Sequence, residues 1–274
     1  MVAASLGATA VPAAVLITSV AMLVGAVVLH ECSHGSFFRA PRANAWVGRA
    51  VGLWLVMPFD SYRAGHRAHH RWAGTDRDPT AAPQGAVPER RWLTLMLHAR
   101  VIPALYVAGV LTPYLLHAAR HGDRRARAIW LLSIAGSLAL HVTLLAQAGP
   151  LYLLVFALAL WLSAVGYDLL FTNNQHLGLR AVEGTGAPPT PAVQTTYSRS
   201  TKMPLSGLLL HFNLHKEHHL SPGEPFWVLP ALHAALRRRR PDVYAFTSSS
   251  LRWRARGHLT STHLLTPRIG DPTE

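Results

Sequence analysis

Residues 15–34, VLITSVAMLVGAVVLHECSH, decide the fold of this chain, because here a long apolar run ends in a histidine motif. The apolar run begins at Ala3 and reaches Leu29, and about 20 such residues are enough to cross a bilayer as an α-helix. A secretory signal peptide would instead need a basic start, a shorter apolar core and a cleavage site. We therefore predict a transmembrane helix that begins outside the cell and brings His30 and His34 to the cytoplasmic surface.

Two more stretches, residues 128–148 and 151–171, are apolar and long enough to span a membrane. The pair Gly149-Pro150 between them is typical of a turn, so the two stretches should form a hairpin. The segment just before the hairpin is basic, which predicts that both ends of the hairpin lie on the cytoplasmic side.

Two further apolar segments are expected to lie in the membrane interface. Residues 46–59 are too few to cross, which predicts a re-entrant or interfacial helix. Residues 93–117 do not cross if the histidine motifs share one side of the membrane, because the hairpin already supplies an even number of crossings. The sequence thus predicts an all-α integral membrane protein with about three transmembrane helices, interfacial helices and a cytoplasmic helical cap that carries the histidines.

The composition also indicates a membrane protein. The chain has 274 residues, of which 50% are hydrophobic and 14% charged, against about 25% charged in a soluble domain. The net charge is +13, yet residues 1–38 and 128–171 contain no Lys or Arg. This distribution follows the positive-inside pattern and gives no basic domain for nucleic acid. We expect a membrane domain with a cytoplasmic metal site over residues 1–236 and a basic cytoplasmic tail over residues 237–274.

Three histidine boxes stand out among the 17 histidines: HxxxH at residues 30–34, and HxxHH at residues 66–70 and 215–219. Positions i, i+3 and i+4 share one face of a helix, so each box aims its imidazoles in one direction. Imidazole suits iron, copper, nickel and zinc, and one mononuclear site needs three or four ligands. With one isolated histidine the candidates are too many for one metal and enough for two. They are His30, His34, His66, His69, His70, His176, His215, His218 and His219.

Histidines outside the boxes are expected to be ordinary polar residues, and these include His98, His117, His141, His233, His258 and His263. His211, one helical turn before the third box, is expected to pack beside the site or to support a ligand. The first box is also a literal HExxH, the zinc-peptidase motif in which the glutamate is the base. That alternative leaves two boxes unused and has only Asp168 as a further carboxylate ligand.

Four segments resemble the membrane fatty-acid desaturase superfamily: HECSHGSFF (30–38), HRAHHRWAGTDRDP (66–79), NNQHLG (173–178) and FNLHKEHHLSP (212–222). The resemblance covers most of residues 20–235 and rests on the order of the three boxes. It implies that the nine histidines hold two irons and that O2 is a co-substrate. It also implies an oxidoreductase of lipid metabolism that removes hydrogen from an unactivated methylene group.

The superfamily contains more than one reaction. Desaturation of a fatty-acyl chain in the membrane is the first hypothesis, because FNLHKEHH is more similar to acyl desaturases. A hydroxylase or ketolase that acts on a lipid, a carotenoid or a specialised metabolite is the alternative, since carotenoid ketolases share the boxes and a comparably short chain. A metal-binding scaffold without activity is a third class, against which the complete boxes argue.

Polar residues close to the boxes are candidates for orienting the imidazoles. Asp168 lies at the end of a span, where an ionisable side chain is costly and therefore a functional candidate. Asn173 is expected to hold a bridging water, and solvation at the surface is an equal alternative for the two aspartates after the second box. The full set is Glu31, Asp76, Asp78, Asp168, Asn173, Asn213 and Glu217.

Electrons are expected to come from a separate ferredoxin-like protein with its reductase. The single cysteine, Cys32, cannot hold an iron–sulfur cluster. The run Arg237-Arg238-Arg239-Arg240 offers a surface either for an acidic ferredoxin or for anionic lipid headgroups. Many relatives have two spans before the first box, whereas this chain has room for one.

Overall fold

The computed structural model describes residues 10–75, 77–79, 112–167, 170–171, 175, 198–204 and 206–246. Within these residues the structure contains helices and no β-strand, which confirms the predicted all-α class. The elements are α1 (Ala10–His34), α2 (Pro41–Trp54), α3 (Phe59–Trp72), α6 (Thr112–His121), α7 (Arg124–Ala148), α8 (Pro150–Tyr167), η4 (Ser206–Leu209), α11 (His215–Leu220), α12 (Leu229–Arg239) and α13 (Pro241–Tyr244).

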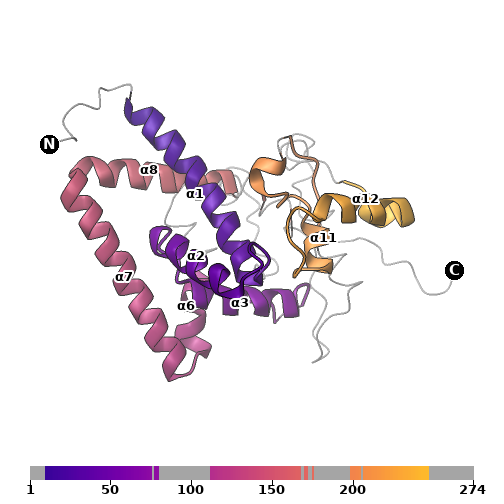
Figure 1. Ribbon diagram of the computed structural model, residues 1–274, viewed down its shortest axis with the longest axis horizontal. Helices are drawn as coiled ribbons and strands as arrows, with labels where there is room; N and C mark the ends of the chain where they lie inside the picture. The colour runs from indigo at the N-terminus through magenta and orange to yellow at the C-terminus, as the bar shows by residue number, and fades with distance from the viewer. Residues whose placement is uncertain are drawn as a thin grey trace, which may run out of the picture.

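Three helices, α1, α7 and α8, are long and apolar enough to cross a membrane, as predicted. Helix α7 begins earlier than expected because the Asp123 side chain caps it, accepting a hydrogen bond from the Ala126 amide at 2.7 Å. Gly149 turns the chain between α7 and α8 with a φ of 71°, a left-handed conformation that favours glycine. The two helices diverge from this turn, and α1 packs along α8 (Figure 1).

The expected interfacial helix over residues 46–59 is shifted toward the N-terminus, because α2 begins at Pro41 and ends at Trp54. Proline is well suited to the first turn of a helix, where its missing N–H costs nothing. The chain then reverses into α3, and a side-chain carbon at Gly48 or Gly52 would collide with Phe59 or with the backbone just before it. Both glycines therefore allow the close packing of α2 against the start of α3.

A polar contact joins three helices inside the apolar part of the protein. The carbonyl of Trp54 accepts a hydrogen bond from His141 Nε2 at 3.1 Å, and Nδ1 of the same imidazole is hydrogen-bonded with the Tyr152 hydroxyl. A backbone carbonyl at a helix end needs a partner wherever water is excluded. His141 therefore has a structural role, in line with its predicted place outside the metal site.

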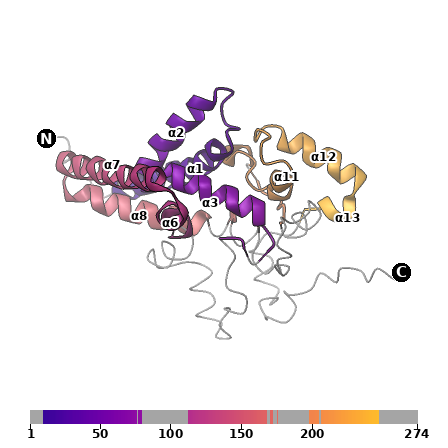
Figure 2. The same ribbon diagram turned by 90° about the horizontal axis from the view of Figure 1, so that it is seen from below.

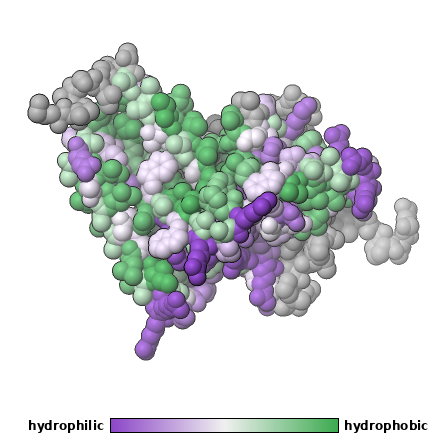
Figure 3. Space-filling model, viewed as in Figure 1, coloured by the Kyte–Doolittle hydropathy of each residue, from purple (hydrophilic) through white to green (hydrophobic). Residues whose placement is uncertain are grey.

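The C-terminal ends of α1 and α3 lie beside α11, and α12 packs on α11 at the end of the molecule opposite the α7–α8 turn (Figures 1 and 2). Hydrophobic surface covers α1, α7 and α8, and hydrophilic surface lies at the start of α7 and over the end of α12 (Figure 3). Helix α6 packs on α3, where the Ser61 hydroxyl donates to the Tyr114 carbonyl at 2.6 Å. The rest of the expected interfacial segment, residues 93–111, lies outside the described residues.

Candidate metal centre

The three boxes lie on three helices whose ends converge. The first box forms the last turn of α1, the second lies in the C-terminal half of α3, and the third forms most of α11. Helical spacing therefore holds in each box, as predicted. The structure brings eight of the nine predicted ligands together, and the ninth, His176, lies outside the described residues.

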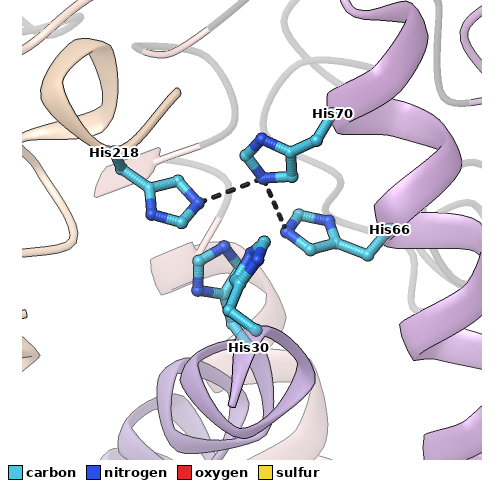
Figure 4. Close-up of side chains that lie close together, drawn as sticks. His30, His66, His70 and His218 are labelled. Atoms are coloured by element: carbon cyan, nitrogen blue, oxygen red, sulfur yellow. Dashed lines mark hydrogen bonds between the residues drawn. The ribbon is translucent and has the colours of Figure 1, made fainter. Parts of the chain in front are cut away.

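The first histidine group contains imidazoles from all three boxes, and each offers a ring nitrogen within 4.8 Å of the others. Nε2 of His70 lies 3.1 Å from Nε2 of His66 and 3.1 Å from Nε2 of His218 (Figure 4). The members of the group are His30, His34, His66, His70 and His218. All are buried except His34, which is half-buried.

The second histidine group takes its members from the second and third boxes only: His69, His215 and His219. Nε2 of His219 lies 3.0 Å from Nε2 of His215 and 3.4 Å from Nε2 of His69. The two groups are adjacent, because the rings of His70 and His219 stack with their centroids 4.3 Å apart. The second box, on α3, thus contributes histidines to both groups: His66 and His70 to the first, and His69 to the second.

The nitrogen positions fit bound metal ions. Ligands about 2.0–2.1 Å from one ion lie roughly 3.0–3.4 Å from one another, and the Nε2 separations within the groups match that range. Nε2 of His30 and Nε2 of His34 are buried and have no hydrogen-bond partner among the described residues. Such orphaned nitrogens are costly in an empty core and are satisfied by a metal.

A buried carboxylate fixes one imidazole in each group. Nδ1 of His30 donates to Glu31 at 3.0 Å, and the Ser36 hydroxyl holds the other Glu31 oxygen at 2.9 Å. Nδ1 of His69 donates to Asp78 at 2.8 Å. A carboxylate only accepts, so the proton stays on Nδ1 and Nε2 keeps its lone pair for a metal. The structure therefore places Glu31 and Asp78 where the sequence predicted ligand-orienting residues.

Burial keeps the imidazoles of His66 and His70 neutral. It is the main cause that holds the pKa values of His66 and His70 well below the usual range. Neighbouring imidazoles lower both pKa values further, with His30 the main neighbour for His66 and His219 for His70. Both side chains are therefore unprotonated at neutral pH, which is the form that binds a metal.

Glu217, also predicted to support a ligand, contacts none of the box histidines through a hydrogen bond in the described structure. It is fully buried on the far side of α11 and accepts hydrogen bonds from His233 Nδ1 at 2.8 Å and from the Ser200 hydroxyl. His233 belongs to neither histidine group, and its contact with Glu217 gives it a structural role on the helix that carries the third box. No sequence pattern marks His233 as the partner of Glu217, because it stands outside every box. The one available signal is that a buried glutamate needs a hydrogen-bond donor.

Asn213 and His211 hold the loop that leads into the third box. The Asn213 amide donates to the Thr201 carbonyl at 2.6 Å, and its oxygen accepts from the Ser206 hydroxyl. His211 Nδ1 lies 3.0 Å from the same hydroxyl, and His211 belongs to neither histidine group. Of the remaining predicted supporting residues, Asp76, Asp168 and Asn173 lie outside the described part of the chain.

The geometry disfavours a zinc peptidase. In that alternative Glu31 would act as a base on a water molecule, but both of its oxygens are engaged, by His30 and by Ser36. His34 also shares its group with histidines from the other two boxes. The first box is therefore one part of a larger centre.

Comparison with known proteins identifies the family. The model of the fatty acid desaturase family matches residues 7–250. A beta-carotene ketolase from a Paracoccus species is 32% identical over 218 residues, which cover 75% of this chain and 72% of the ketolase. A second Paracoccus ketolase is 29% identical, over 74% of this chain and 71% of its own. The sn-1 oleoyl-lipid 12-desaturase of Arthrospira platensis is 44% identical over 46 residues, 17% of this chain and 13% of the desaturase.

The fold and the converging histidines thus define a membrane oxidoreductase of the histidine-box class. The chain belongs to the fatty acid desaturase family, whose members among its relatives are lipid desaturases and beta-carotene ketolases. The resemblance predicted from the four sequence segments is confirmed.

Proposed function

We propose that the two histidine groups bind two iron ions and that the protein is an O2-dependent oxygenase of a long apolar substrate. The observation that carries this proposal is the convergence of eight imidazoles from three helices into two adjacent groups. Bound iron would supply O2 activation and the removal of hydrogen from an unactivated C–H bond.

His176 is the remaining candidate for the second histidine group, which has three members in the described structure. The residue before it supports this assignment. The buried Gln175 donates through its side chain to the Phe212 carbonyl at 3.1 Å, and the Phe212 ring contacts those of His30 and His215. A fourth imidazole would complete a set comparable with the first group.

The chain's own residues prepare the centre for this chemistry. Glu31 and Asp78 keep the protons of His30 and His69 on Nδ1, so that the metal-binding nitrogens stay unprotonated. Burial of His66 and His70 excludes water, which would otherwise intercept a reactive oxidant. The apolar surfaces of the spans give a long apolar substrate a route to the end of α1 from within the bilayer.

We place ketone-forming oxygenation of a carotenoid-like polyene first among the reactions of the family. The two beta-carotene ketolases match about three quarters of the chain, whereas the 12-desaturase matches a short segment. Converting one methylene to a ketone consumes two O2, four electrons and four protons and releases three water molecules. A methylene next to a conjugated chain has weakened C–H bonds, which suits this reaction.

Desaturation of an acyl lipid remains the second candidate, and one observation favours it. The short match to the 12-desaturase has the higher identity, 44%. Removing two hydrogens from adjacent carbons consumes one O2, two electrons and two protons and releases two water molecules. The two reactions share the metal centre and differ in the product, so product analysis separates them.

We further propose that the histidine boxes and the C-terminus face the cytoplasm and that the N-terminus lies outside. The support is the basic start of α7, Arg124, Arg125 and Arg127, at the same end of the spans as the boxes. Cationic segments next to spans stay on the cytoplasmic side.

The test is co-expression with a ferredoxin and its reductase in a bacterial host that makes beta-carotene, followed by mass spectrometry of pigments and of acyl lipids. A carotenoid that gains an oxygen and loses two hydrogens supports the ketolase proposal, provided that His70→Ala abolishes the product. A new double bond in acyl lipids would move the protein to the desaturase branch. Iron-loaded protein that modifies neither class would overturn both assignments of substrate.

A further inference from the structure

Two exposed clusters of arginines lie on the described surface. One, at the start of α7, consists of Arg124, Arg125 and Arg127, and the other consists of Arg237–Arg240 at the end of α12. Arg240 forms an ion pair with Asp242 at 2.9 Å, and no ion pair involves Arg237, Arg238 or Arg239 within the described residues. Either cluster is attractive to an anionic partner, so their positions must distinguish them.

The positions of the two clusters relative to the apolar spans differ. The α7 cluster is the first turn of a span, which places it at the level of lipid headgroups. Helix α12 lies at the opposite end of the molecule from the α7–α8 turn, and its C-terminal end points away from the spans in both views (Figures 1 and 2). The α12 arginines are exposed and lie on the side of the histidine groups away from the spans, where a soluble protein can reach them.

Helix α12 also contacts α11, the helix that carries the third box. His233 lies four residues before Arg237, which is roughly 6 Å along a helix. Its Nδ1 donates to Glu217 at 2.8 Å, and Glu217 stands between His215 and His218 on α11. One helix thus carries the cationic surface at its end and the contact with the ligand-bearing helix near its middle.

We infer that the end of α12, Arg237–Arg240, is the docking surface for a small acidic one-electron carrier protein. This inference rests on the proposed function, in which each O2 consumed in oxygenation takes up two electrons and two protons. The carrier gives one electron per encounter and leaves oxidised, so it must dock and dissociate twice per O2. A cationic patch next to the centre suits such brief encounters, because charge speeds association without requiring a large apolar interface.

The test uses the full chain, loaded with iron, in nanodiscs of neutral phosphatidylcholine, with a plant-type [2Fe–2S] ferredoxin as the probe. One variant carries Arg237→Gln, Arg238→Gln and Arg239→Gln. The matched control carries Arg124→Gln, Arg125→Gln and Arg127→Gln, which removes the same charge at the α7 cluster. Glutamine has a helix propensity close to that of arginine, so neither change breaks its helix.

Ferredoxin binding to the nanodiscs and the KM for ferredoxin are measured as salt is raised. We expect the α12 variant to weaken binding and raise this KM by about tenfold, with less salt dependence and unchanged iron content. The control should match the wild type, and lysine at the three α12 positions should restore most of the binding. Turnover driven by dithionite should be the same in all variants.

Equal ferredoxin binding by the α12 variant and the wild type would overturn the inference. So would an effect of the α12 substitutions confined to nanodiscs that contain anionic lipid, which would assign these arginines to headgroups. Absence of turnover in the wild type with dithionite as well as with ferredoxin would instead overturn the proposed function. The binding measurement still decides the docking surface in that case.

Discussion

The first two boxes and the third box are held in place by different means. The first box ends a helix of 25 residues and the second lies in a helix of 14, and both helices pack along much of their length. The third box occupies α11, a helix of six residues. Isolated helices shorter than about 12–15 residues are marginal in water, so α11 depends on its neighbours.

The neighbours of α11 are polar and lie on the side away from the metal groups. Glu217 contacts His233 and Ser200, and the Ser200 hydroxyl also accepts from the Lys216 amide at 3.0 Å. The Lys216 ammonium donates to the Val243 carbonyl at 2.7 Å. The first histidine group thus rests mainly on long helices, whereas the second rests on a set of buried and half-buried hydrogen bonds.

Loss of a box ligand should have the largest effect. His70→Ala and His218→Ala each remove a nitrogen from the crowded centre of the first group, so turnover should fall by more than about 100-fold, beyond the effect of changing a supporting residue. Iron content and product formation are measured on membranes with equal amounts of inserted protein. His121→Ala, an exposed histidine on α6, is the control. Full activity in either box variant would remove that residue from the ligand set.

Substitutions of the supporting carboxylates should lower the metal affinity of one histidine group more than that of the other. Asp78→Asn weakens the hold on His69 and should lower metal affinity of the second group by about 10–100-fold, while the first group keeps its metal. Glu31→Gln should show the reverse preference through His30. Chelator titration with iron analysis measures both. Equal loss from both groups in each variant would show that the groups bind metal as one unit.

The contact between Glu217 and His233 should matter for stability and for the second group. His233→Leu leaves a buried carboxylate oxygen without its donor and should lower the free energy of unfolding by about 1–3 kcal/mol. His233→Asn keeps an N–H donor in nearly the same place and should restore much of the loss. Thermal unfolding in detergent and iron content report the two effects. A leucine variant as stable as the wild type would show that α11 needs no such support.

The smallest effect is expected far from the centre, at His141. His141→Phe removes the hydrogen bonds to Trp54 and Tyr152 and should lower stability by about 0.6–2 kcal/mol. Iron content and turnover should stay as in the wild type. Combining the change with Tyr152→Phe in a double-mutant cycle measures the coupling. A loss of iron from the single variant would extend the centre into the spans.

The fold was predictable where it depends on the length of an apolar run or on residues typical of a turn. The three spans and the Gly149-Pro150 turn follow from runs that are long enough to cross a bilayer. The helix ends were less predictable, because they depend on single residues such as Asp123 at the start of α7 and Pro41 at the start of α2. Helix α12 passes the domain boundary predicted after residue 236 and ends at Arg239, because its arginines continue the helix.

The site was predictable as a set of residues and not as an arrangement. Helical spacing marked the boxes, and Asp78 stood close enough to the second box to be considered. That His69 turns to a different group from His66 and His70 depends on how α3 lies against α11, which no local pattern contains. The link from His233 to Glu217 joins two helices through a single buried hydrogen bond, so it too required the tertiary structure.

The most direct test of the central claim is the metal content of the purified full chain, measured by mass spectrometry of the elements together with Mössbauer spectroscopy. Two adjacent histidine groups predict about two irons per chain in a coupled pair. His218→Ala should disturb the signal of that pair. A single iron per chain, or zinc in place of iron, would contradict the account.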